Sequence, residues 1–254
     1  MKDEPEVDVE FSRKCLAAEK GDAKAQYSLA EAYATGDGVA QDLSEAFRWV
    51  RLAADQGFAE AQYRLGLMYA TASGVEQDLE EAVRWTRLAV DQGYAAAQFK
   101  LGMFYARATG VRKDVEEAVR LFRLAADQGD AMAQFNLGVV YGIGQGVSQD
   151  LAEAMRWTRL AADQGHAKAQ HVLASAYATG EGAPKDRTEA LRWLRLAAEQ
   201  EDAGALMQLA DLYMMGEGVP KDAGEGIRLT RLAAKQGEPL AEEMLRELNK
   251  LTES

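Results

Sequence analysis

The sequence predicts an all-α solenoid, in which antiparallel helix pairs follow one another along the chain, and three observations support this prediction. The chain repeats itself every 36 residues, in six copies without insertions, at 21–56, 57–92, 93–128, 129–164, 165–200 and 201–236. Twelve of the 36 columns hold one residue type in all six copies, which identifies a repeat architecture. Within each copy, apolar residues recur at helical spacing in two separate stretches.

The first half of each copy predicts a helix, which we call helix A. In the first copy Ala25, Leu29 and Tyr33 are four residues apart and therefore share one stripe of a helix. The residue after the leucine is alanine or glycine in every copy, so another backbone can approach closely there. The tyrosine also recurs in every copy, and we interpret its ring as a wedge between helices because a buried ring contributes a large apolar area.

The second half of each copy predicts another helix, which we call helix B. Glycines such as Gly36 and Gly38 end helix A, since glycine tolerates a positive φ. An aspartate then precedes a glutamate by three residues in every copy, as in Asp42 and Glu45, which is the spacing of a capping box. Catalytic carboxylate pairs are the alternative, but their repetition in all six copies favours capping. Helix B is therefore expected to begin just after the aspartate.

Helix B is expected to bury Ala46, Trp49 and Ala53 and to expose two columns of arginine. These columns begin with Arg48 and Arg51, and we place them on the side of the helix opposite Trp49. Two interpretations are open, a solvated ladder paired in part with aspartates four residues on, or a stripe that binds phosphate. The net charge of −12 favours the ladder, because an acidic protein repels phosphate.

Half units flank the six copies. Residues 1–20 predict an N-terminal capping helix with an acidic start, and residues 237–254 predict a C-terminal capping helix. This arrangement suits a solenoid, whose terminal units need a polar outer face.

Composition and charge limit the classes of partner. With 48% hydrophobic and 28% charged residues, the chain is expected to fold in water. Its acidic excess argues against nucleic acid, and we expect no membrane insertion and a monomer. The first ten residues lack the apolar run of a secretory signal, and Cys15 can form no internal disulfide. We expect a cytoplasmic protein, or a periplasmic or secreted one if an upstream signal peptide was removed.

The repeated residues resemble a known family. Each copy follows the pattern Ala-x-Ala-Gln-x-x-Leu-Gly-x-x-Tyr, then Gly-x-Gly-Val, then Asp-x-x-x-Ala, then an aromatic residue before Ala-Ala-x-x-Gly. This pattern is similar to the Sel1-like repeat, a relative of the tetratricopeptide repeat, over residues 21–236. Departures cluster in the sixth copy, where Leu206 replaces glutamine, Glu201 replaces glycine, and Gly224 and Gly226 enter helix B. That copy is expected to be the least stable.

The resemblance implies a fold and a role. It implies a right-handed superhelix whose A helices line a concave surface, and a non-catalytic scaffold or adaptor that binds other proteins, in bacteria often around envelope or signalling processes. It implies no catalytic residues. Two alternatives are a β-lactam-binding or hydrolysing enzyme, as suggested for cysteine-rich relatives, and a purely structural or self-assembling array. Cys15 is the only cysteine here, so the chain does not match those relatives.

The expected binding surface is the side of helix A that points away from the leucine stripe. One column there is apolar in the middle copies and polar at both ends, and a column that varies between equivalent units can carry individual function. A neighbouring column is mostly aromatic, which fits packing between adjacent A helices as well as binding. Ala70, Ala106 and Gly142 would leave the floor open. The predicted groove for a peptide or hydrophobic segment is lined by Tyr63, Leu67, Phe99, Met103, Met132, Phe135, Val139 and His171.

No metal, cofactor or phosphate loop is predicted. His166 and His171 are the only histidines, and their spacing of five residues puts them on different faces of a helix without a third ligand. Every Gly-x-Gly joins two helices, whereas a phosphate-binding loop joins a strand to a helix.

Overall fold

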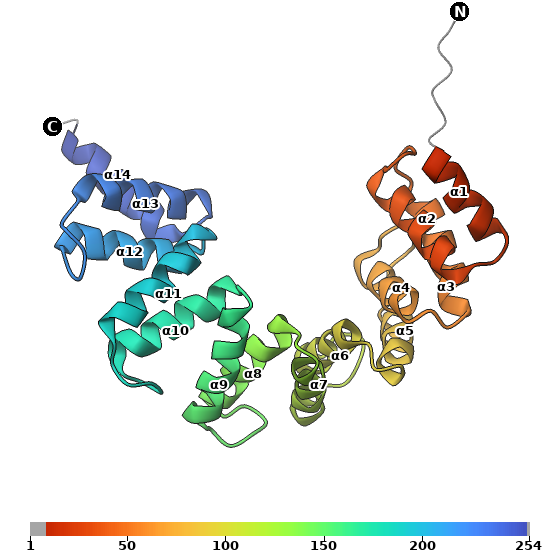
Figure 1. Ribbon diagram of the computed structural model, residues 1–254, viewed down its shortest axis with the longest axis horizontal. Coiled ribbons are helices and arrows are strands. Elements are labelled where there is room, and N and C mark those ends of the chain that lie inside the picture. The colour runs from red at the N-terminus through yellow and green to blue at the C-terminus, as the bar shows by residue number, and fades with distance from the viewer. Residues whose placement is uncertain (1–8, 253–254) are drawn as a thin grey trace, which may run out of the picture. The chain divides into compact units, whose positions relative to one another are not determined.

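The computed structural model describes residues 9–252, and within this range the chain forms fourteen α-helices and no β-strand (Figure 1). The fold is an α-solenoid, as predicted, and the chain divides into two compact units, Met1–Gln128 and Gly129–Ser254, which we call unit 1 and unit 2. Unit 1 contains α1 (Val9–Glu19), α2 (Ala23–Thr35), α3 (Leu43–Asp55), α4 (Ala59–Thr71), α5 (Leu79–Asp91), α6 (Ala95–Arg107) and α7 (Val115–Asp127). Unit 2 contains α8 (Ala131–Ile143), α9 (Leu151–Asp163), α10 (Ala167–Thr179), α11 (Arg187–Glu199), α12 (Ala203–Met215), α13 (Ala223–Lys235) and α14 (Pro239–Thr252).

The helices alternate as the repeat predicts. Helix A of the six copies is α2, α4, α6, α8, α10 and α12, and helix B is the helix that follows each of them. The flanking helices α1 and α14 occupy the two half units. The acidic start at residues 1–8 and the last two residues, 253 and 254, lie outside the described residues.

The leucine stripe of helix A forms the core. Leu29, Leu65 and Leu137 are almost completely buried. The close approach expected beside the leucine is confirmed at Gly66 in α4, where an added Cβ would lie 2.9 Å from the Ala82 carbonyl oxygen of α5. A larger residue would push the two helices of the copy apart.

The aspartate caps are confirmed, but the reciprocal half of the capping box is wrong. The Asp42 carboxylate accepts hydrogen bonds from the backbone N–H groups of Ser44 and Glu45, at 2.9 and 3.0 Å. The Asp42 N–H, however, donates to the Tyr33 carbonyl oxygen across the loop, at 2.9 Å. Because that donor is already satisfied, Glu45 pairs instead with Arg48, with 3.0 Å between the charged groups.

The placement of the arginine columns opposite the indole is also wrong. In α5 the Arg84 guanidinium lies 4.4 Å from the centre of the Trp85 ring, a cation–π arrangement. Arg87, in the second column, donates to the Tyr105 hydroxyl of the next copy at 2.9 Å. Long arginine side chains can bend along the helix so that the stem packs and the charge stays wet, which a position on a helical wheel does not convey. The arginines therefore help to join successive copies.

A pair of glutamines forms a joint that the sequence interpretation missed. Gln26 of α2 is buried and its amide donates to the Ala18 carbonyl oxygen of α1, at 3.1 Å. Its own oxygen accepts a hydrogen bond from Gln56 at the end of α3, at 2.7 Å. We call this the glutamine joint. The glutamine pair recurs as Gln62–Gln92, Gln98–Gln128, Gln134–Gln164 and Gln170–Gln200.

Candidate interaction surface

The aromatic column of helix A packs between successive copies. Tyr63 lies against Tyr94, the residue just before the next helix A, with 5.5 Å between ring centres. Phe135 stacks on His166 in the same way at 4.6 Å. The packing interpretation of this column is therefore supported, and these rings are half-buried in the free protein.

Two other predicted site residues also contact neighbouring side chains. Phe99 lies 5.7 Å from Phe122 of helix B in its own copy, measured between ring centres. His171 places its Nδ1 3.0 Å from the Asp202 carboxylate of the next copy. Both side chains contribute to packing as well as to the surface.

The exposure of the variable column changes from copy to copy. Leu67 and Met103 in unit 1 are half-buried, whereas Val139 in unit 2 is 41% exposed. Met132, in a different column of helix A, is 49% exposed. The predicted groove residues therefore fall into two sets, Tyr63, Leu67, Phe99 and Met103 in unit 1, and Met132, Phe135, Val139 and His171 in unit 2.

Unit 2 contains an apolar hollow of about 360 Å³ between the fourth and fifth copies. Val139 and Ile143 of α8 and Val172 of α10 stand at its rim, and Gly138 and Gly142 of α8 lie among the residues that line it. Gly142, which was expected to leave the floor of the groove open, lines this hollow. We call this site the apolar hollow.

Ile143 and Val172 were missed by the sequence interpretation, although a signal was available. They are 63% and 44% exposed. The equivalent positions in earlier copies carry threonine or arginine in the first case, and serine, arginine, lysine or asparagine in the second. An exposed aliphatic residue where the preceding copies carry polar ones is an indication of a contact surface.

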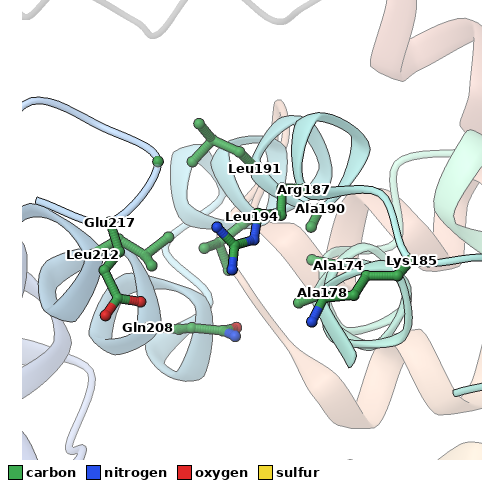
Figure 2. Close-up of a pocket in the computed structure, with 11 residues that line it drawn as sticks. Ala174, Ala178, Lys185, Arg187, Ala190, Leu191, Leu194, Gln208, Leu212 and Glu217 are labelled. Carbon is green, nitrogen blue, oxygen red and sulfur yellow. The ribbon is translucent and has the colours of Figure 1, made fainter. Parts of the chain in front are cut away.

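A second hollow of about 210 Å³ lies between the fifth and sixth copies (Figure 2). It involves the same part of the repeat as the apolar hollow but has a different lining. Lys185 and Arg187 end on it together with Gln208 and Glu217, beside the aliphatic residues Leu191, Leu194 and Leu212. Within residues 9–252 neither Lys185 nor Arg187 forms an ion pair. We call this site the basic hollow.

Partial burial shifts the pKa values of two ionisable side chains near the candidate surface. Burial is the main cause that raises the pKa of Tyr27 to about 12, and the Glu31 carboxylate adds to the shift. Burial also lowers the pKa of His166, whose Nδ1 accepts the Ala169 N–H at 3.2 Å. Across the described range there is no cluster of three or more side chains suited to holding a metal ion, and no helix there is long and apolar enough to span a bilayer.

Comparison with protein families gives one model, described as the Sel1 repeat, that covers most of the chain. It matches six times, at residues 23–58, 59–94, 95–130, 131–166, 167–202 and 203–238. Each match begins at the first residue of a helix A. No curated protein matches the chain.

Solved structures with a similar fold include two that are also similar in sequence. The Escherichia coli protein c5321, a protective antigen of uropathogenic strains, has 37% identity and a TM-score of 0.83. The match covers 92% of this chain but 50% of that one, so this chain spans half its length. A Sel1 repeat protein from Oxalobacter formigenes has 32% identity and a TM-score of 0.82, covering 89% of this chain and 99% of that one.

A third structure shows the fold alone. The immunity protein Pa5087 from Pseudomonas aeruginosa has 23% identity and a TM-score of 0.52, with 74% of this chain and 72% of that one covered.

Proposed function

The chain belongs to the Sel1 repeat family, and we propose that it is a non-catalytic scaffold that binds a partner protein through the A-helix side of its repeats. Sel1 repeats are generally scaffolds for protein interactions. The observation that carries the proposal is the apolar hollow, where exposed aliphatic side chains surround a floor of small residues. Apolar surface grouped in a concavity favours burial against a partner.

The shape and chemistry of the apolar hollow favour a protein segment over a small polar ligand. Val139, Ile143 and Val172 offer branched aliphatic surface, and Met155 of α9 also lines the hollow. Methionine adapts its conformation to different partners. A partner helix or extended segment would insert apolar side chains here, as in other groove-binding modes.

The variable column of helix A offers a second contact surface for the partner in unit 1. We propose that Leu67 and Met103, both half-buried, also touch the partner, beside the rings of Tyr63 and Phe99. Their smaller exposed area predicts a smaller share of the binding free energy than that of Val139.

The substitution Val139→Glu tests the proposal. A carboxylate at this position stays hydrated in the free protein, because Val139 is 41% exposed. In a complex it would be pressed against apolar partner surface, and the loss of hydration is expected to weaken binding at least about tenfold. Partners are first captured from a lysate with the parent protein and identified, and their affinity for each variant is then measured by calorimetry.

Ala152→Glu is the matched control. It adds the same charge to helix B of the same copy, at an exposed position where the second and third copies carry Glu80 and Glu116. The control is expected to bind like the parent. Equal affinity of Val139→Glu and the parent for every captured partner would contradict the proposal.

A further inference from the structure

The basic hollow owes its charge to a lysine that alternates with glutamine between copies and to an arginine found in this copy alone. Where Lys185 stands, the first, second and fourth copies carry glutamine, and Gln41, Gln77 and Gln149 each donate to a carbonyl oxygen of helix A at 2.8 to 2.9 Å. Where Arg187 stands, the same three copies carry leucine. In the fifth copy, two cations therefore replace the side-chain hydrogen bond to helix A and the aliphatic side chain that those three copies have.

These two cations are not neutralised by an ion pair in the part of the chain that the structure describes. Among the residues that the structure describes, neither Lys185 nor Arg187 takes part in an ion pair, and Glu217 is the one carboxylate in the lining of the hollow. The chain as a whole carries a net charge of −12, but charges farther away than about 8 Å are largely screened at physiological ionic strength. The local field therefore favours an anion.

A polar atom in the same hollow lacks a partner. The Gln208 side-chain oxygen is buried and accepts no hydrogen bond within the described chain. An unsatisfied buried acceptor is unfavourable, so a ligand that reaches this oxygen with an N–H donor relieves that penalty. Figure 2 shows the Gln208 amide ending on the same hollow as Lys185 and Arg187.

The aliphatic wall defines the rest of the ligand. Leu191, Leu194 and Leu212 line the hollow beside the charged groups, which suits a side chain with methylene groups and apolar neighbours. A free inorganic anion would leave this wall uncovered. A volume of about 210 Å³ holds one or two side chains and no folded element.

We propose that the basic hollow binds a glutamate or aspartate side chain on an extended acidic segment of the partner protein. The carboxylate lies between Lys185 and Arg187, a backbone N–H of the segment donates to Gln208, and adjacent apolar side chains cover the three leucines. This inference rests on the proposed scaffold function and specifies the chemistry of the partner.

The test uses a defined probe and the full chain. The probe is a terminally blocked peptide in which leucine and glutamate alternate, and its counterpart carries glutamine in place of glutamate. Binding is followed by NMR through the methyl signals of Leu191, Leu194 and Leu212. The acidic peptide is expected to shift these signals and to bind at least about tenfold more tightly than its counterpart, with an affinity that falls as salt is added.

The decisive variant restores the repeat. Lys185→Gln combined with Arg187→Leu introduces the residues that the first, second and fourth copies carry at these positions, so the fold is expected to be retained. Binding of the acidic peptide should fall at least about tenfold in this variant. Lys113→Gln is the control, since it makes the same change at the equivalent position of the third copy, and it should leave binding unchanged.

Three results would overturn the inference. The first is equal affinity of the protein for the two peptides, and the second is unchanged binding of the acidic peptide by the double variant. The third is binding of inorganic phosphate at the same site with the affinity of the acidic peptide, which would make the basic hollow a site for small anions. The Val139→Glu variant separates this inference from the proposed function. If that variant keeps its partners while the double variant loses the peptide, the apolar hollow fails and the basic hollow stands.

Discussion

The loop after helix A lies tightly against the preceding copy in unit 1 and loosely in unit 2. In unit 1 a Cβ added to Gly74 would fall on the Leu43 carbonyl oxygen. In unit 2 a Cβ added to Gly182 would lie 2.9 Å from Cγ of the flexible Met155 side chain and 3.6 Å from the Leu151 carbonyl oxygen, and one added to Gly218 would meet nothing within 4 Å. Glycine occurs at this loop position in every copy, but for different reasons. At Gly74 close packing requires it, whereas at Gly218, near the end of unit 2, only the backbone conformation does.

One residue behind the loop also differs between the second and third copies and the fifth copy. Met68 and Phe104 fill the space between copies in unit 1 and are 3% and 4% exposed. The equivalent residue of the fifth copy is Ala176, which lines the apolar hollow. One repeat pattern therefore permits closed and open contacts between copies, and the candidate binding surface lies where the packing is incomplete.

The largest expected effect comes from the invariant loop glycine. Gly74→Ala should lower the free energy of unfolding by about 4 kcal/mol, because a left-handed φ of 72° and a clash with backbone are combined. Gly218→Ala, with a φ of 76° and open space, should lower it by about 1 kcal/mol. Urea denaturation of both variants measures the difference. Equal losses would show that the two loops are packed alike.

Filling the apolar hollow should make the contact between the fourth and fifth copies more like the closely packed contacts between copies in unit 1. Ala176→Met introduces the residue found at Met68, and the added buried surface should raise the free energy of unfolding by about 1 kcal/mol. The same change should weaken partner binding, because the new side chain occupies the hollow. A thermal melt combined with the affinity measurement checks both effects. Destabilisation, or full retention of binding, would contradict this account of the hollow.

At the ends of helix A, unit 1 carries backbone strain that unit 2 lacks. α4 and α6 end at Ala72 and Ala108, which adopt φ values of 56° and 57°, whereas the helix A ends in unit 2 are glycines. Ala72→Gly should therefore raise the free energy of unfolding by about 0.5 to 1 kcal/mol, since glycine takes this conformation without steric cost. Gly180→Ala at the equivalent position of the fifth copy should have the opposite sign. Both changes are measured as shifts in the midpoint of urea denaturation, provided that the dependence of the unfolding free energy on urea concentration stays the same.

The smallest expected effect is a dependence of unit 2 on pH. The pKa of His166 is lowered in the folded protein, mainly by burial and further by Lys168, while a backbone hydrogen bond and the Asp202 carboxylate act in the opposite direction. The unfolded chain therefore binds this proton more readily, and stability should decline as the pH falls through about 6.5, the ordinary value. Unit 1 has Phe58 and Tyr94 at the equivalent positions, which do not titrate in this range.

His166→Asn isolates that contribution. Asparagine can also accept the capping N–H but carries no ionisable group, so the decline between about pH 8 and about pH 5 should become shallower. An unchanged pH profile would assign the decline to other groups.

The helices were predictable because their signals are local. Asp42 supplies both the capping oxygen and the boundary of α3, and the spacing of Leu29 and Tyr33 sets the buried stripe of α2. The partner of Glu45 was not predictable, because it depends on whether the Asp42 N–H finds an acceptor across the loop. That contact follows from the path of the chain and not from spacing.

The candidate site was predictable only in part, for a similar reason. The varying column indicated Val139, since the fold does not dictate a residue there. The hollows depend on distances between successive copies, which a single copy does not encode. Lys185 and Arg187 stood in the sequence as ordinary surface charges, and only their joint position at the basic hollow gives them a role.

The glutamine joint has a consequence for how such a chain can change in length. The joint links side chains within a copy and reaches the preceding copy through a backbone carbonyl, as Gln26 does at Ala18, so it does not depend on the preceding copy's sequence. Unequal recombination that adds or removes 36 residues would recreate an intact joint at the new border wherever the incoming copy carries this glutamine. The sixth copy has Leu206 instead, and Gln236 bonds to Glu201. Gene rearrangement can therefore reshuffle the surface columns of the first five copies, whereas the sixth copy meets the copy before it without this joint.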